Sequence, residues 1–222
     1  MSLKRLGIAL VASLALAAVF ASSAFATATT TKSFWREAGT KLSSGTTKAV
    51  KCTASTPFIF KFSVAGEIEI EAQKLECPSG DVIKQEGEQA IATGTLKFSG
   101  LTVMKPAGCK TNASITTKPL TAKTFMEGAT TYERFAPTEG EVFANVPLTE
   151  CAAEGTYPAK GNVFGQAGNP TGTEAVNQPL TFSGAINTTA GGALTLGTNA
   201  ATISGKANNE LGSGAKFSAN ES

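Results

Sequence analysis

The sequence contains no histidine, and Asp81 is its one aspartate among 222 residues. Without histidine, the chain lacks the commonest general base and cannot form Ser-His-Asp or Cys-His catalytic sets. The same absence removes most zinc and copper sites, and the four cysteines lie too far apart for a Cys-x-x-Cys metal site. A catalytic carboxylate pair would have to be built from glutamates. We therefore expect no catalytic residue, no metal ion and no cofactor.

Long apolar runs are also missing, except near the N-terminus. Residues 6–20 are apolar, follow Lys4 and Arg5, and precede the small-x-small sequence Ala24-Phe25-Ala26. This order predicts a signal peptide over residues 1–26, and the run is short for a spanning helix, which needs about 20 apolar residues. We expect a secreted, extracellular or cell-surface protein of 196 residues, which is 222 less 26, with no integral membrane segment after cleavage.

The mature chain has no excess charge of either sign. Removing Lys4 and Arg5 from the 19 basic residues leaves 17, which equals the 17 acidic residues. A neutral protein has no general electrostatic attraction to nucleic acid, so we expect no nucleic-acid partner.

An even number of cysteines in an exported chain predicts disulfides. The four cysteines, Cys52, Cys77, Cys109 and Cys151, permit three pairings. We favour Cys52 with Cys77 and Cys109 with Cys151, because each pair closes a local loop around strands that look paired. On the chain-entropy model each bridge contributes roughly 3–4 kcal/mol.

Strand patterns dominate the mature sequence. Phe58, Phe60 and Phe62 alternate with other residues at the period of a half-buried strand, and a similar alternation follows a predicted three-residue turn at 65–67. Together the two runs predict a β-hairpin in which Phe62 faces Ile70 on the buried side.

The domain organisation follows from the same patterns. No window of ten or more residues shows a clear helical period, whereas short strands alternate with glycine-rich turns. We predict one antiparallel β domain at 34–218, either a β-sandwich or barrel-like, between a flexible segment at 27–33 and a frayed C-terminus at 219–222.

The one acidic cluster is Glu67, Glu69 and Glu71, with Glu76 nearby. On a strand the first three would project from one face and could gather calcium or support glycosidic acid/base chemistry. They alternate with apolar residues, however, so we favour the solvated face of a two-faced sheet.

Three aromatic residues are candidates for stacking on a ligand: Trp35, Tyr132 and Tyr157. Trp35 is the only tryptophan, and we favour a packing role in the core or at a sheet edge for it over a ligand contact.

The signal sequence, the four cysteines and the glycine-rich C-terminal strands together resemble exported all-β proteins of unknown function from high-GC soil bacteria. The resemblance lies in the layout and covers most of the mature chain. It implies a secreted or cell-surface β domain and assigns no activity and no functional residue.

Three functions remain as hypotheses. The leading one is a non-enzymatic structural or adhesive protein of the cell surface, including a self-assembling subunit in which residues 27–33 pair with a neighbour's sheet edge. The alternative is an extracellular module that binds a glycan, a cell-wall component or a protein. The third, which we favour least, is a secreted hydrolase that depends on glutamates.

Overall fold

The computed structural model describes residues 32–63, 66–78, 80–127 and 129–221, and it confirms the predicted all-β class. Within these ranges helix is confined to α1 (Gly184–Thr189), whose first turn is capped by Ser183. No helix of the described ranges is long and apolar enough to cross a membrane. The predicted signal peptide lies outside them. The strands are β1 (Ser33–Glu37), β2 (Thr40–Lys41), β3 (Thr47–Ser63), β4 (Glu67–Glu76), β5 (Val82–Glu86), β6 (Gln89–Gly94), β7 (Lys97–Lys105), β8 (Ser114–Thr116), β9 (Leu120–Glu127), β10 (Thr130–Pro137), β11 (Val142–Leu148), β12 (Gly155–Gly161), β13 (Val163–Ala167), β14 (Gln178–Phe182), β15 (Leu194–Leu196), β16 (Asn199–Leu211) and β17 (Phe217–Glu221).

Two closed rings of antiparallel strands share β3 and β16. The first ring runs in the order β3, β5, β6, β9, β10, β13, β14 and β16, and the pairing of β16 with β3 closes it. The second ring runs in the order β3, β4, β7, β8, β11, β12, β15 and β16. Between β8 and β11 this ring is closed by the isolated bridge of Thr117 with Ala144.

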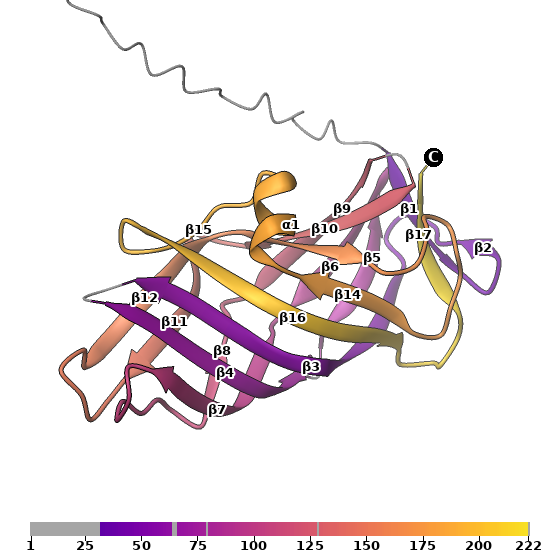
Figure 1. Ribbon diagram of the computed structural model, residues 1–222. Coiled ribbons are helices and arrows are strands. Elements are labelled where there is room, and N and C mark those ends of the chain that lie inside the picture. The colour runs from indigo at the N-terminus through magenta and orange to yellow at the C-terminus, as the bar shows by residue number, and fades with distance from the viewer. Residues whose placement is uncertain (1–31, 64–65, 79, 128, 222) are drawn as a thin grey trace, which may run out of the picture.

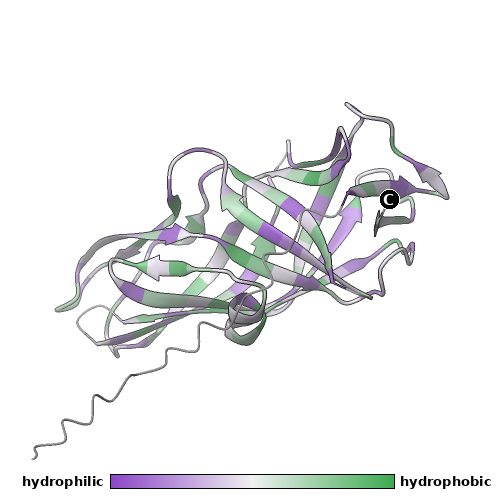
Figure 2. Cartoon of the chain, turned by 90° about the horizontal axis from the view of Figure 1, so that it is seen from above, coloured by the Kyte–Doolittle hydropathy of each residue, from purple (hydrophilic) through white to green (hydrophobic). Residues whose placement is uncertain are grey.

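The rings lie end to end and form one elongated barrel (Figure 1). β3 and β16 extend through both rings. Each other strand of one ring is adjacent along the chain to a strand of the other, with α1 inserted between β14 and β15. Each continued strand pairs with its neighbours in sequence, so the topology is an up-and-down barrel. Apolar and polar residues alternate along many of its strands (Figure 2).

An aromatic cluster fills the waist where the rings meet. Phe58 of β3 packs between Phe98 of β7 and Phe182 of β14, with ring centroids 5.4 and 5.7 Å apart. Phe60 and Phe135 extend the cluster, at 4.8 Å from Phe98 and 5.6 Å from Phe182 respectively. This cluster separates the interior of the first ring from that of the second.

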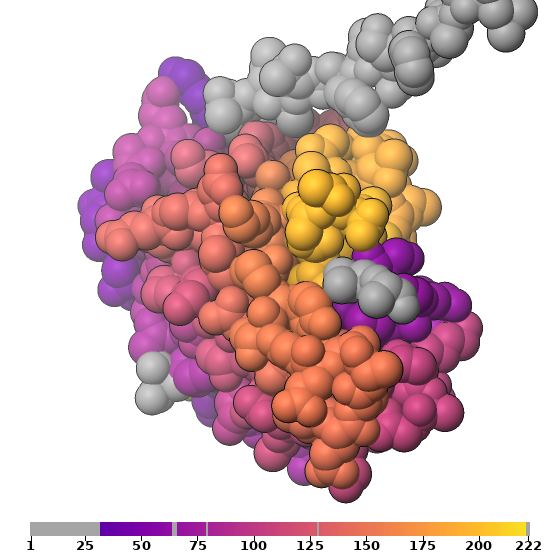
Figure 3. All heavy atoms as spheres, turned by 90° about the vertical axis from the view of Figure 1, so that its left-hand side faces the viewer, coloured from indigo at the N-terminus to yellow at the C-terminus, as the bar shows by residue number. Residues whose placement is uncertain are grey.

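The two ends of the barrel differ. A three-stranded sheet in the order β17-β1-β2 covers the end of the first ring, where Trp35 and Phe217 pack on Ile83, Ala90 and Leu211. At the opposite end, the described residues form a closely filled face with no deep hollow in view (Figure 3).

The structure confirms the favoured disulfide pairing. Cys52 bonds to Cys77, and Cys109 bonds to Cys151. The first bridge lies in the wall of the barrel between the start of β3 and the end of β4. The second joins the loop after β7 to the loop after β11, beside the bridge of Lys110 with Thr149. It therefore ties together the seam between β8 and β11.

The hairpin of β3 and β4 forms as predicted, but with another register. Phe62 pairs with Ile68 and Phe60 pairs with Ile70, so the predicted pairing of Phe62 with Ile70 is wrong. The reason is that Ser63 already pairs with Glu67, which belongs to β4 rather than to the turn. The buried faces are nevertheless those expected, because a shift of two residues keeps every side chain on its side of the sheet.

The ordered domain extends further at both ends than the composition indicated. Ser33, placed in the flexible segment, is fully buried in β1, and its Oγ accepts a hydrogen bond from the Ala90 N–H. Glu221, placed in the frayed C-terminus, pairs with Ser33. Both polar ends are ordered because β1 and β17 pair with each other over the open end of the first ring. This pairing joins segments that are far apart in sequence.

Candidate functional site

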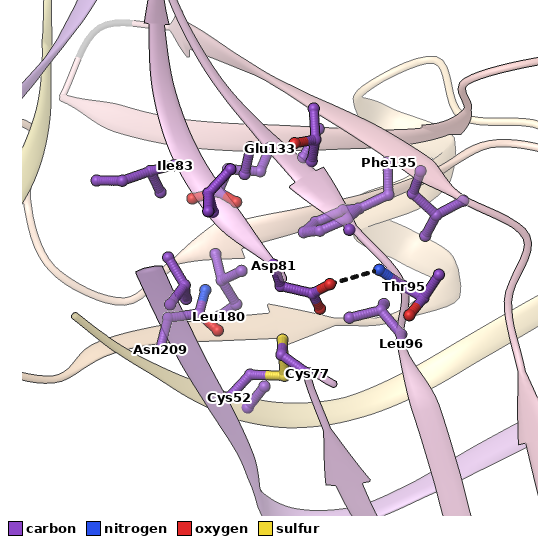
Figure 4. A pocket seen from close by; sticks show the side chains of 18 of the residues that line it. Cys52, Cys77, Asp81, Ile83, Thr95, Leu96, Glu133, Phe135, Leu180 and Asn209 are labelled. Atoms are coloured by element: carbon purple, nitrogen blue, oxygen red, sulfur yellow. Dashed lines mark hydrogen bonds between the residues drawn. A yellow bond between two sulfur atoms is a disulfide. The ribbon is translucent and has the colours of Figure 1, made fainter. Parts of the chain in front are cut away.

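The first ring encloses a cavity of about 60 Å³ between the waist and the covering sheet (Figure 4). The corresponding space in the second ring is about 10 Å³, so side chains fill that half almost completely. Since one buried water needs about 15 Å³, the cavity has room for about four waters or one small organic molecule. An eight-stranded barrel is just wide enough for such a space. Its apolar walls include Leu75, Ile83, Leu96, Leu120, Leu180 and Phe182.

Glu133 is the most unusual side chain of this cavity. It lies in β10 between Thr131 and Phe135, the three inward residues of that strand, and it is 9% exposed. It forms no hydrogen bond or ion pair with any described residue. Its cross-strand partners, Thr124 of β9 and Gly165 of β13, carry no charge. Burial without a partner raises the pKa of Glu133 from 4.5 to about 7, because the charged form loses its hydration.

Asp81 supplies a second carboxyl to the same cavity. It precedes β5, and its Oδ1 accepts a hydrogen bond of 2.9 Å from the backbone N–H of Thr95. Burial raises the pKa of Asp81, and the bond from Thr95 opposes that rise. The close approach requires glycine at position 94, since a β-carbon there would lie 2.1 Å from Oδ1.

The remaining polar side chains of the cavity carry no charge. Asn209 of β16 lines it beside the disulfide, because it pairs in register with Cys52 of the neighbouring strand β3. Asp81 and Glu133 are the only titratable groups among the described residues of the lining, because Cys52 and Cys77 are oxidised. The cavity therefore holds two carboxyl groups and no basic side chain.

A smaller cavity of about 20 Å³ adjoins Glu133 on the side of β17. Thr131, Gln178 and Ser218 contribute polar groups to its walls. Glu133 and Trp35 line both cavities, so the carboxyl lies where the apolar interior meets a more polar rim.

The covering sheet is fixed over the cavity by buried hydrogen bonds. Trp35 donates its Nε1–H to the carbonyl of Ile91 at 2.9 Å. Gln85 of β5, 1% exposed, accepts from the N–H of Trp35 at 3.0 Å and donates to the carbonyl of Ser33 at 3.2 Å. These bonds lock β1 to the rim of the first ring.

The three predicted stacking residues do not come together. Trp35 is buried and lines the cavity. Tyr132 lies on the outer face of β10, because its neighbours Thr131 and Glu133 point inward. Tyr157 belongs to the second ring, where its hydroxyl donates to the carbonyl of Ala153 at 2.9 Å. These three aromatic side chains therefore do not share a face on which a ligand could stack.

The acidic cluster lies on the outside of β4, as the favoured interpretation has it. Glu69 forms ion pairs with Lys61 at 3.1 Å and Lys105 at 3.9 Å, and Glu67 pairs with Lys105 at 3.0 Å. Glu71 accepts a hydrogen bond from Gln73. Lysines of β3 and β7 therefore neutralise much of the cluster. No group of acidic, cysteine or histidine side chains among the described residues could hold a metal ion.

A wider hollow of about 430 Å³ lies outside the barrel between Lys118-Pro119 and residues 138–142. Its charged side chains, Lys118, Glu139 and Glu141, are exposed, and Glu141 pairs with Lys160. Solvent screens such groups, so the hollow carries no strong electrostatic preference. The interior cavity is the better candidate site.

Neither Glu133 nor Asp81 is among the site residues that the sequence predicts. One signal was present for Glu133, since it lies two residues before Phe135 and thus on the same face of a strand. If Phe135 is buried, Glu133 must point inward too. For Asp81 no local pattern indicated a site, because it lies in a turn and reaches the cavity only through the pairing of β5 with β6.

No protein-family model, curated protein or solved structure matches this chain. The chemistry of the site must therefore be inferred from its own groups. A carboxyl with a pKa of about 7 is a hydrogen-bond donor when protonated and a strong acceptor when ionised. In an apolar cavity it binds best to a group that replaces the water it has lost.

Proposed function

We propose that this protein is an exported, non-catalytic binding protein whose ligand site is the cavity of the first ring. The observation that carries the proposal is Glu133, a buried carboxyl without a partner among the described residues that faces a largely apolar space. An unpaired buried carboxyl reduces the stability of a fold, so its presence beside a cavity is typical of a site that a ligand completes.

Export is part of the proposal. The two disulfides fit an oxidising compartment, and the N-terminal pattern is that of a cleaved signal sequence. N-terminal sequencing of the mature protein should begin at Thr27. An intact N-terminus on the protein recovered from its own cell envelope would contradict this part.

The binding hypothesis is favoured over a self-assembling subunit by the closure of the barrel. Among the described strands, every member of the two rings has a neighbour on both sides, although β8 and β11 meet only through the bridge of Thr117 with Ala144. A donated strand therefore finds a free edge only at the small covering sheet and at the short seam between β7 and β11. Ser33, moreover, is already used within the chain, where it pairs with Glu221. Few backbone groups remain for the edge-to-edge assembly that strand donation requires.

A hydrolase is disfavoured by size. Glycosidic acid/base chemistry needs two carboxyls that flank the glycosidic bond to be cleaved, with the sugar bound between them. Asp81 and Glu133 do share a cavity, but its volume of about 60 Å³ is too small for a sugar. A compact ligand fits better than any polysaccharide.

Ligand-observed NMR tests the proposal with a panel of alcohols, carboxylates and amines of up to about five non-hydrogen atoms. The emission of Trp35, the only tryptophan, gives a second readout because its ring lines the cavity. We expect at least one class to bind the mature protein and to lose binding in Ala122→Leu, which fills the cavity from β9. Ala152→Leu, at an exposed loop position, is the control. Equal binding to both variants, or no binding at all, would overturn the proposed function.

A further inference from the structure

We propose that the ligand is a small organic cation, an alkylammonium ion, whose charged end pairs with Glu133 while its alkyl chain contacts the apolar wall. This inference rests on the proposed function and names the class of compound that the site takes. Glu133, Asp81 and Asn209 are the groups that distinguish this cavity from an ordinary packing defect.

The charge of the lining indicates the charge of the ligand. Asp81 and Glu133 both face the cavity, and the part of the chain that the structure describes contributes no lysine or arginine to the lining. An anion would add a third acidic group to a space of low polarity, where like charges repel strongly. A cation supplies the missing counter-ion, which is what an unpaired buried carboxylate lacks.

The hydrogen-bonding groups of the lining indicate an ammonium ion rather than a cation that has no N–H donors. An ammonium carries three N–H donors and needs three acceptors when it leaves water. Glu133 offers two oxygens that no described residue uses. Asp81 has one oxygen engaged by Thr95 and a second that is free of described partners. Asn209 adds an amide oxygen.

The apolar wall and the volume limit the rest of the ligand. Leu120, Leu180 and Phe182 surround the space with aliphatic and aromatic surface. A volume of about 60 Å³ corresponds to about four water-sized groups, so one nitrogen and two or three carbons fill it. Ethylammonium and n-propylammonium match this size, and larger amines such as those of long-chain bases do not.

The test uses ethylammonium and n-propylammonium chloride as probes. Ethanol, n-propanol and propionate serve as neutral and anionic counterparts of similar size. Dissociation constants are measured on the mature protein by ligand-observed NMR and by Trp35 emission at pH 8. We expect the ammonium ions to bind roughly ten- to a hundredfold more tightly than the alcohols, the range for a charge-assisted hydrogen bond.

Two variants assign the effect to the cavity. Glu133→Gln keeps the shape of the side chain and should remove the preference for ammonium over alcohol. Glu127→Gln, at an exposed position of β9, should leave it unchanged. Ammonium binding that survives in Glu133→Gln would mean attachment elsewhere and would overturn the inference.

The pH dependence of the unaltered protein provides an independent readout. Ammonium affinity should fall as the pH drops below about 7, where Glu133 takes up a proton, whereas alcohol binding should change much less. Asp81 is the only other titratable group in the lining, and Asp81→Asn should shift the midpoint less than Glu133→Gln does. An ammonium affinity independent of pH between 5 and 8 would contradict the role of Glu133.

The outcomes separate the inference from the proposed function. If alcohols or propionate bind in the cavity and ammonium ions do not, the binding function stands and the cation class is wrong. If no probe binds either to the mature protein or to Ala122→Leu, the cavity holds only water and both proposals fail.

Discussion

The ring of Phe58 packs directly against the backbone of Gly205, at the waist where the two rings of the barrel meet. A β-carbon on Gly205 would lie 2.8 Å from two atoms of that ring. Gly205 also lies in an irregular part of the ladder, where the register between β16 and β3 shifts. β16 therefore passes from one ring to the other at a point where only glycine leaves room for the central phenylalanine.

Gly205→Ala should destabilise the protein by about 1–3 kcal/mol, the usual cost of adding a group to a filled core. Urea unfolding measures the loss. The assigned cause is tested by a double-mutant cycle with Phe58→Ala, which removes the Cγ and Cδ atoms that the new β-carbon would meet. Because the clash disappears with the ring, the double variant should lose about 1 kcal/mol less than the sum of the single variants. Strictly additive losses would show that the two residues do not act on each other.

Removing either disulfide should lower the free energy of unfolding, but only one removal should alter the cavity. Cys52 and Cys77 close a segment of 25 residues, and Cys109 and Cys151 one of 42, so each bridge is worth about 3–4 kcal/mol. The first bridge lines the cavity and the second lies outside it. Paired Cys→Ala variants, compared by urea unfolding and by probe binding, should therefore differ in binding and not in stability. Equal loss of binding in both would argue against the location of the site.

The elements with strong local patterns could be predicted from sequence. The alternation of Phe58, Phe60 and Phe62 identified the long strand β3, and all three side chains are buried. The disulfide pairing followed because Cys52 and Cys77 flank one hairpin. These features depend on residues close in sequence, for which periodicity and loop length carry most of the information.

The closure of the barrel could not be predicted in the same way. It depends on the pairing of β3 with β16, in which Phe62 lies opposite Ala201 although the two are far apart in the chain. Nothing local marks either strand as the partner of the other. The cavity follows from this closure, so Glu133 had no recognisable partner or pocket at the level of sequence. Glu133 can be recognised as a lining group, and not only as a residue of a strand, once the ring is formed.

Gln85→Ala should loosen the sheet that covers the cavity. The substitution leaves the N–H of Trp35 and the carbonyl of Ser33 without their partner in a buried place, at a cost of about 1–3 kcal/mol for each unsatisfied group. Amide hydrogen exchange should therefore quicken in β1 more than in β3. Gln73→Ala, at an exposed position of β4, serves as the control and should leave exchange in β1 unchanged. Uniform quickening across the barrel would indicate global destabilisation instead.

Glu133→Gln should stabilise the ligand-free protein at neutral and alkaline pH. The folded-state pKa of Glu133 is about 7, against 4.5 for the unperturbed group, so the folded protein holds this proton more tightly than the unfolded chain. The stability that Glu133 contributes is complete below about pH 4.5 and is lost as the pH rises through 7. At about 1.4 kcal/mol per pH unit the loss amounts to about 3 kcal/mol.

The glutamine variant lacks this titration while it retains Asp81, whose own contribution cancels when the two proteins are compared. The difference in unfolding free energy between Glu133→Gln and the unaltered protein should therefore grow by about 3 kcal/mol between pH 4.5 and pH 8. Urea unfolding at several pH values across this range measures it. If the unfolding free energies of the two proteins changed in parallel with pH, Glu133 would be hydrated or paired in solution. Ionisation lowers the stability of the protein only when the carboxyl is buried and unpaired. A growing difference that ethylammonium then abolishes at pH 8 would connect the cost of the buried charge with its relief by a cation.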